Sequence, residues 1–136
     1  MISQEEFMEL LDEISGEIPS EIFQGLNGGV ILRPEEKLHP QSQGNDLWVL
    51  GDYNRNQMGR YINIYYGSYS RVYGHLEGEA LRKKLRHTLL HEFRHHLESL
   101  AGEYDLEVED AIQIAKYKQM YTTKQEEKYQ DNETDH

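Results

Sequence analysis

The sequence contains no cysteine, and it has no hydrophobic run long enough to cross a bilayer. Without cysteine there can be no disulfide bond, no cysteine-ligated metal and no thiol nucleophile, so any metal must be bound by histidine, carboxylate and water. The first six residues are Met1-Ile2-Ser3-Gln4-Glu5-Glu6, an acidic start that does not resemble a secretory signal. We therefore expect a cytoplasmic protein that does not span a membrane.

Basic residues are also scarce. The 136-residue chain has 14 Lys and Arg against 25 Asp and Glu, which gives a formal net charge of −11. Nucleic-acid binding requires clustered Lys and Arg that neutralise phosphates, so this balance argues against a nucleic-acid partner. An acidic cleft would instead favour basic or neutral substrates. The length supports one domain with a modest core, and the composition leaves the oligomeric state open.

Hydrophobic spacing and turn residues predict an α+β fold in which a short mixed sheet packs on a long helix, with flanking N- and C-terminal helices. Ser3 and Glu6 form a capping-box pattern at the start of the first helix, and Gly102 is a plausible end for the long one. The expected elements are a helix at 3–15, a helical turn at 20–26, strands at 29–33, 47–53 and 61–66, a turn at 53–59, a loop at 67–78, and helices at 79–100 and 107–121. Residues 1–121 form the expected single domain, and 122–136 form a charged tail.

The long predicted helix carries an apolar stripe on one side and a histidine motif on the other. Its apolar residues recur at helical spacing, so this side is expected to face the core. They are Leu81, Leu85, Leu89, Phe93, Leu97 and Leu100. The motif His91-Glu92-x-x-His95 places two imidazoles four residues apart, on one face of the helix.

This motif predicts a zinc site with catalytic potential. His91 and His95 can both reach one Zn²⁺, and Glu92 can act as the general base toward a water that the metal activates. The corresponding function is a zinc-dependent peptidase that acts on a peptide or protein substrate. An extended peptide could add as a strand to the edge of the 61–66 strand.

A catalytic zinc normally has three protein ligands, and the third is not fixed by the motif. Asp105 ranks first, since it follows Gly102, where the chain could turn back toward the metal. Glu98 lies on the same helix face as the two histidines. The weaker alternatives are Glu103, Glu107, His75, His39 and water. Among the nearby residues, His96 is expected to be a packing or surface residue, and Tyr69 and Tyr73 to be loop aromatics that could in principle stabilise an oxyanion.

The chain resembles the small bacterial zincin-like proteins called minimal metalloproteases. The resemblance covers about residues 5–110 and rests on Ile18-Pro19, Leu50-Gly51-Asp52-Tyr53, Ile62-Asn63-Ile64-Tyr65-Tyr66-Gly67 and above all on His91-Glu92-Phe93-Arg94-His95-His96. It implies a compact zincin-like domain in which His91 and His95 bind zinc and Glu92 is the catalytic acid and base.

The chain departs from this family after the second histidine. Members typically continue with a glycine and then an acidic residue, but Glu98 and Ala101 stand at those positions here. A Gly-x-x-Asp occurs one helical turn later, ending at Asp105, about 6 Å further along the helix axis. Two other functions therefore stay open: a non-catalytic zinc-binding interaction or structural module of the same fold, and a helical scaffold that binds no metal.

Overall fold

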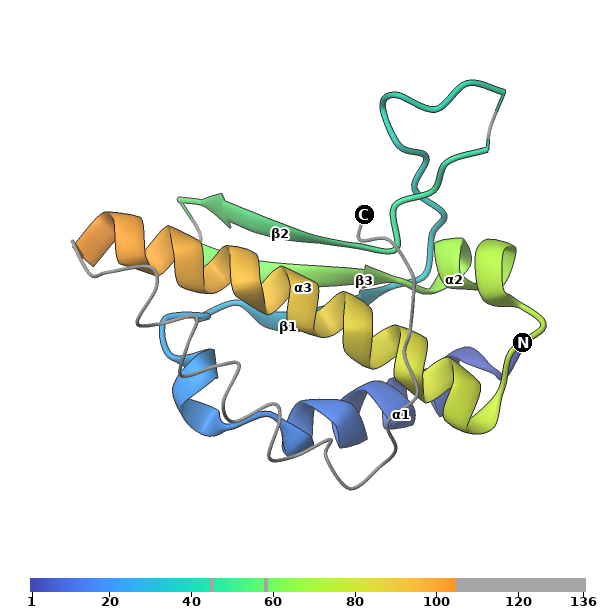
Figure 1. Ribbon diagram of the computed structural model, residues 1–136, viewed down its shortest axis with the longest axis horizontal. Helices are drawn as coiled ribbons and strands as arrows, with labels where there is room; N and C mark the ends of the chain where they lie inside the picture. Colours follow the sequence, from blue (N-terminus) through green and yellow to red (C-terminus); the bar gives the residue numbers. More distant parts are fainter. Residues whose placement is uncertain (45, 58, 105–136) are drawn as a thin grey trace.

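The computed structural model of this chain describes residues 1–44, 46–57 and 59–104. They form an α+β fold, as predicted. In chain order the elements are α1 (Gln4–Glu17), the 3₁₀ helix η1 (Ser20–Phe23), β1 (Gly29–Arg33), β2 (Gly51–Asn56), β3 (Gly59–Tyr65), α2 (Tyr66–Tyr73) and α3 (Gly78–Tyr104). Figure 1 shows α3 running across the sheet, with α1 beneath both. The predicted helix at 107–121 and the tail at 122–136 lie outside the described residues.

Helix α1 begins as its sequence predicts. Ser3 Oγ accepts a hydrogen bond from the Glu6 backbone N–H (3.1 Å), and Glu6 Oε1 accepts one from the Ser3 backbone N–H (2.9 Å). This capping box satisfies two of the N–H groups that a helix start leaves unpaired. The buried face consists of Phe7, Leu11 and Ile14, which recur at helical spacing.

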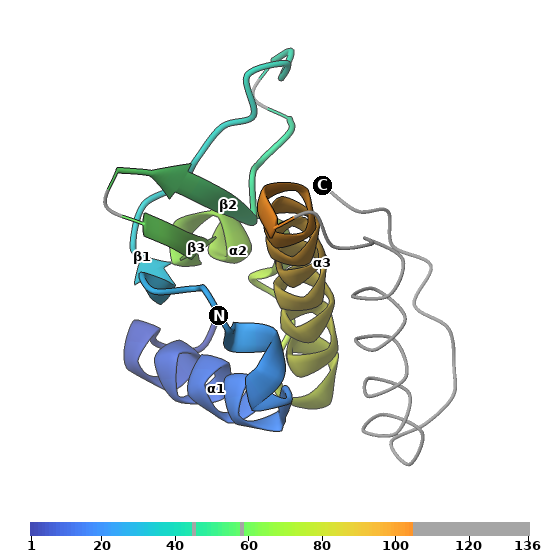
Figure 2. The ribbon, with the colours of Figure 1, turned by 90° about the vertical axis from the view of Figure 1, so that its left-hand side faces the viewer.

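The sheet is mixed and has the strand order β1-β3-β2. Strand β1 pairs in parallel with β3, and β2 pairs with β3 in the antiparallel direction. In β3, Ile62 and Ile64 are fully buried in the core that the sheet shares with α1 and α3. Figure 2, which looks along α3, shows the sheet, α1 and α3 surrounding this core. The predicted bounds of β1 are confirmed, and β3 spans 59–65 where 61–66 was expected.

The predicted strand at 47–53 and turn at 53–59 were wrong in their bounds, and only residues 51–53 are strand as expected. Strand β2 begins at Gly51 and continues to Asn56, where Asn56 pairs with Gly59 across the hairpin. Residues 47–49 pair instead with the preceding loop, because Val49 N–H donates to the Lys37 carbonyl and His39 N–H donates to the Leu47 carbonyl (both 2.8 Å). The prediction placed the strand on the apolar residues 47–50. The structure forms it from the more polar residues 51–56, because these pair with β3.

The predicted loop at 67–78 was also wrong in its first half, which forms helix α2. Tyrosine-rich sequence and Gly67 favour a strand or loop by local propensity. The segment forms a helix because this buries Tyr69 completely. The Tyr69 ring packs on Phe7 with 5.3 Å between the ring centroids. Gly67 is required in this helix, since a Cβ there would lie 2.6 Å from the backbone of Glu35 and Glu36.

Helix α3 is longer than predicted and passes through Gly102 to Tyr104, so the expected stop at Gly102 was wrong. Gly102 is exposed, and its backbone remains helical. The predicted stripe is buried at Leu81, Leu85, Leu89 and Phe93, whereas Leu97 and Leu100 are only partly buried. Ion pairs fasten α3 to α1: Arg86 Nη2 lies 2.7 Å from Glu17 Oε1, and Arg82 contacts both Glu13 and Glu17.

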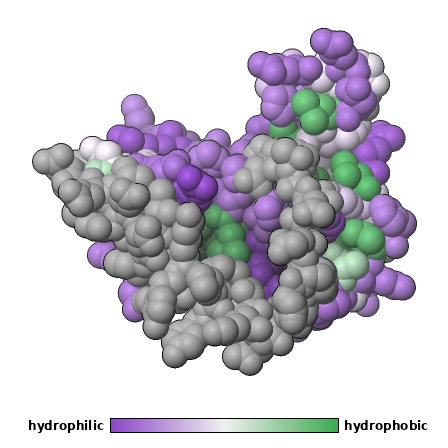
Figure 3. Space-filling model, viewed as in Figure 1, coloured by the Kyte–Doolittle hydropathy of each residue, from purple (hydrophilic) through white to green (hydrophobic). Residues whose placement is uncertain are grey.

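The surface in Figure 3 is mainly hydrophilic over the described residues, with separate small apolar areas. The large apolar side chains that are most exposed are Met1, Met8, Leu38 and Val72. Single exposed apolar side chains of this kind are ordinary on a protein surface. No helix in the described ranges is long and apolar enough to cross a membrane.

Candidate metal site and pocket

The two motif histidines meet on the surface of α3. Their Nε2 atoms lie 3.2 Å apart, and their rings are nearly perpendicular, with centroids separated by 4.7 Å. The regular helix between them produces this approach, because residues four apart are neighbours on one face. His91 is partly exposed and His95 is exposed.

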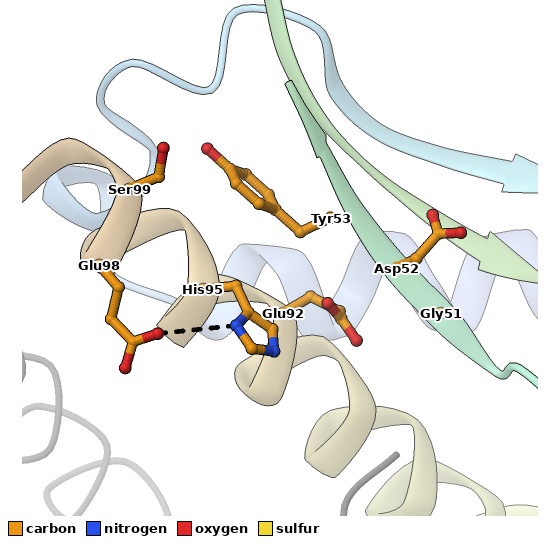
Figure 4. Close-up of a pocket in the computed structure, with 7 residues that line it drawn as sticks. All are labelled: Gly51, Asp52, Tyr53, Glu92, His95, Glu98 and Ser99. Carbon is orange, nitrogen blue, oxygen red and sulfur yellow. Dashed lines mark ion pairs between the residues drawn. The ribbon is translucent and has the colours of Figure 1, made fainter. Parts of the chain in front are cut away.

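A pocket of about 560 Å³ lies between α3 and β2 beside this pair. Its walls are Gly51, Asp52 and Tyr53 from β2 and Glu92, His95, Glu98 and Ser99 from α3. Figure 4 shows the side chains of Glu92 and Tyr53 in the space between the two elements. Glu92 is only 4% exposed, whereas His91 is partly exposed and His95 is exposed. A buried carboxylate and His95, one of the two motif histidines, thus line the same pocket.

The described ranges contain no group of three His, Cys, Asp or Glu side chains that could hold a metal ion. His39 and His75 therefore do not join the pair. Asp105 and Glu107, and the Glu103 side chain, are outside what the structure describes, so these third-ligand predictions stay untested. Because α3 stays helical through Gly102, Tyr104 lies roughly 14 Å beyond His95 along the helix axis.

Glu98 contacts His95, but on the opposite edge of the ring from His91. Glu98 Oε1 lies 3.6 Å from His95 Nδ1, while His95 Nε2 faces His91. The other carboxylate oxygen of Glu98, Oε2, lies 3.4 Å from Arg94 Nε. The dashed line in Figure 4 marks the contact between Glu98 and His95.

His96 is completely buried, which confirms that it is a packing residue, and it positions one pocket wall. Its Nε2 lies 2.8 Å from the Gln24 carbonyl oxygen, and its Nδ1 lies 3.0 Å from the Tyr53 hydroxyl. A carbonyl can only accept, so Nε2 carries the proton and Nδ1 accepts from Tyr53. Burial lowers the pKa of His96 and thereby favours this neutral ring.

Asp52, which lines the pocket from β2, accepts four hydrogen bonds, and Figure 4 shows its carboxylate directed away from Glu92 and His95. The donors are Lys37 Nζ (2.6 Å), Asn54 Nδ2 (2.7 Å), the Tyr65 hydroxyl (2.9 Å) and Asn63 Nδ2 (3.1 Å). Burial by itself would raise the pKa of Asp52, but these hydrogen bonds outweigh it and lower the pKa. Asp52 therefore stays ionised and fixed in place.

Neither tyrosine considered for oxyanion stabilisation lines the pocket. Tyr69 is enclosed, its hydroxyl donates to the Lys84 carbonyl oxygen and is hydrogen-bonded to the Thr88 hydroxyl, and burial raises its pKa. Sequence reasoning gave no chemical role to Asp52, Tyr53 or Ser99, which do line it. Asp52 and Tyr53 are adjacent in the resemblance segment 50–53, but only pairing of β2 with β3 places them beside α3.

The structure is that of a small α+β protein whose long helix carries paired histidines and places Glu92 and His95 in a pocket beside the edge strand β2. No protein-family profile matches the chain, and no curated protein does. Among solved structures, the chain is similar to a conserved hypothetical protein from Thermus thermophilus. The identity is 37%, the TM-score is 0.64, and the match covers 74% of this chain and 99% of that one. This chain belongs to the same family as that protein.

Proposed function

We propose that this protein is a zinc-dependent peptidase of the zincin-like type. The observation that carries the proposal is the 3.2 Å separation between the Nε2 atoms of His91 and His95. Two nitrogens bound to one tetrahedral zinc at its usual bond lengths are about 3.3 Å apart. The histidine pair is thus already spaced for a shared ion, with no rearrangement of α3.

His91 and His95 would hold the zinc, and a third ligand would come from elsewhere in the protein or from water. Asp105 remains the proposed protein ligand. It would require the chain to reverse after Tyr104, since α3 leads away from the pair. Bound zinc would polarise the scissile carbonyl and lower the pKa of a water toward ~7.

Glu92 is the proposed general base and acid. From its buried place in the pocket, it would accept a proton from the attacking water and then donate it to the leaving amine. Tyr53, whose hydroxyl proton is directed to His96, would act as a fixed wall of the substrate site.

The substrate strand is expected to add along β2. The sequence suggested the edge of the 61–66 strand, but that prediction was wrong, because β3 is the central strand and is paired on both sides. Strand β2 is at the edge of the sheet and lines the pocket, so an extended peptide that pairs with it would pass over Glu92.

The test replaces the general base and leaves the proposed ligands in place. We expect Glu92→Gln to bind one zinc per chain, as the wild type does, while its cleavage of a fluorescence-quenched peptide library falls about 10²- to 10⁴-fold. His91→Ala should lose both zinc and cleavage. Glu79→Gln, on the first turn of the same helix, is the matched control and should retain both. Wild-type protein that binds no zinc would rule the proposal out.

One observation favours a second candidate, a non-catalytic zinc-binding module. The described residues supply two nitrogen ligands and no third. This alternative expects zinc to bind and stabilise the fold, no peptide to be cleaved, and Glu92→Gln to behave as the wild type. The same set of variants therefore decides between the two.

A further inference from the structure

We propose that Glu98 is a positioning residue for His95 and not a zinc ligand. This inference rests on the proposed function, because it assigns the residue that orients one of the two proposed ligands. Glu98 stands where the resembled family has a glycine, so the family pattern assigns it no role.

The two edges of the His95 ring face different partners. Nε2 faces His91 Nε2 at 3.2 Å, and Nδ1 faces Glu98 Oε1 at 3.6 Å. An ion bound by both Nε2 atoms would lie on the His91 side of the ring. The Glu98 carboxylate lies on the Nδ1 side of the ring. From there it can orient the ring without contacting an ion that is bound at Nε2.

Proton placement explains why this arrangement suits a metal ligand. A neutral imidazole has one N–H, so a ring that binds a metal through Nε2 must carry its proton on Nδ1. That proton would then face Glu98, and a carboxylate only accepts hydrogen bonds. A carboxylate behind a ligand histidine fixes the ring and makes its metal-binding nitrogen more basic.

The 3.6 Å separation is an ion-pair distance and exceeds that of a hydrogen bond. A small rotation of the Glu98 side chain, which is 40% exposed, can shorten it once Nδ1 carries the proton. Arg94 Nε, 3.4 Å from Oε2, holds the far oxygen on the same side of the helix. Because Arg94 and Glu98 are both substantially exposed, that ion pair is weak, and Arg94→Ala should change zinc binding little.

The first experiment measures zinc affinity by competition with a chromophoric chelator. We expect Glu98→Ala to weaken zinc binding about 10- to 100-fold, while the stoichiometry stays at one zinc per chain. Glu98→Gln keeps an oxygen that can accept from Nδ1 and should recover part of the loss. Glu79→Ala removes the same charge from the first turn of α3 and should bind zinc as the wild type does. Equal affinity of Glu98→Ala and wild type would overturn the inference.

Cobalt substitution distinguishes positioning from ligation. A positioning residue leaves the ligand set unchanged, so the visible absorption bands of the Co²⁺-loaded Glu98→Ala protein should match those of the wild type. Loss of an oxygen ligand would shift those bands, and that result would overturn the inference in favour of direct coordination by Glu98.

Nuclear magnetic resonance of the metal-free protein tests the contact without zinc. Nitrogen-15 spectra of the histidine rings should show His95 with its proton on Nδ1 in the wild type and an increased Nε2–H form in Glu98→Ala. An unchanged tautomer would contradict the inference, even if zinc were never bound. Conversely, the wild type could show the Glu98-dependent tautomer and yet bind no zinc. That result would rule out the proposed zinc peptidase but would still support the contact between Glu98 and His95.

Discussion

At the scale of single residues, hydrogen bonds hold two adjacent side chains of β2, Asp52 and Tyr53, in place. Asp52 receives hydrogen bonds from Lys37 and three other side chains, and Tyr53 is bonded to a buried neutral His96. Such satisfied networks hold side chains in one arrangement, whereas an unpaired buried polar group would cost free energy. These contacts therefore favour one arrangement of Asp52 and Tyr53 on strand β2.

Replacing Asp52 by Asn should destabilise the protein in a pH-dependent way. The amide places a donor among existing donors, so we expect the free energy of unfolding at pH 7 to fall by about 1–2 kcal/mol. The folded-state pKa of Asp52 is lowered, so its contribution is complete above the unfolded value of about 4 and is lost as the pH falls through the folded pKa. Urea unfolding from pH 7 to pH 2 measures this.

The exposed Asp12 on α1 supplies the control for that experiment, since Asp12→Asn removes the same charge outside the network. Its unfolding free energy should stay close to that of the wild type at each pH. A difference between Asp52→Asn and wild type that persists undiminished at pH 2 would contradict the role of the lowered pKa.

At the scale of elements, close backbone approach decides where helices and strands form. Helix α2 contains Gly67 because the chain at Glu35 and Glu36 lies against it, and β2 contains Gly51 because Thr88 of α3 lies there. A Cβ on Gly51 would be 3.0 Å from Thr88 Cγ2. These glycines thus serve packing between elements, although glycine weakens a helix or strand by local propensity.

Two glycine-to-alanine variants should therefore change stability in opposite directions. Gly67→Ala introduces a Cβ 2.6 Å from backbone atoms and should lower the unfolding free energy by about 1–3 kcal/mol. Gly16→Ala, in α1, meets nothing within 4 Å and should raise it by up to about 1 kcal/mol through helix propensity. Thermal and urea unfolding of both variants measure the contrast, and stabilisation by Gly67→Ala would contradict the packing explanation.

At the scale of the whole molecule, the proposed metal site couples to folding. The histidine pair belongs to α3, whose apolar side packs in the core with α1 and the sheet. An ion that binds only the folded arrangement stabilises it by mass action. The same helix thus links the stability of the core to the occupancy of the site.

Zinc should accordingly raise the stability of the wild type and not that of a ligand variant. At a free zinc concentration 100 times the Kd, the free energy of unfolding should increase by about 2.7 kcal/mol. His91→Ala, which lacks a proposed ligand, should show no such increase relative to its own stability without zinc. Calorimetry with and without zinc measures both values, and equal stabilisation of the two proteins would place the zinc elsewhere.

The sequence predicted features that depend on neighbours along the chain. The capping box at Ser3 and Glu6, the buried side of α1 and the convergence of His91 and His95 all follow from helical periodicity. Strand β1 was also predicted with its observed bounds, since Asn27-Gly28-Gly29 signals a turn directly before an apolar run. Local sequence therefore supplied the proposed ligands and the general base.

Only the tertiary structure decided features that depend on distant residues. Pairing with β3 made 51–56 a strand, and contact with the core made 66–73 a helix. Residues such as Asp52 and Tyr53 joined the pocket because β2 lies beside α3. Periodicity fixes which residues share a face of one element, but the identity of the opposing face depends on packing between segments that are far apart in the chain.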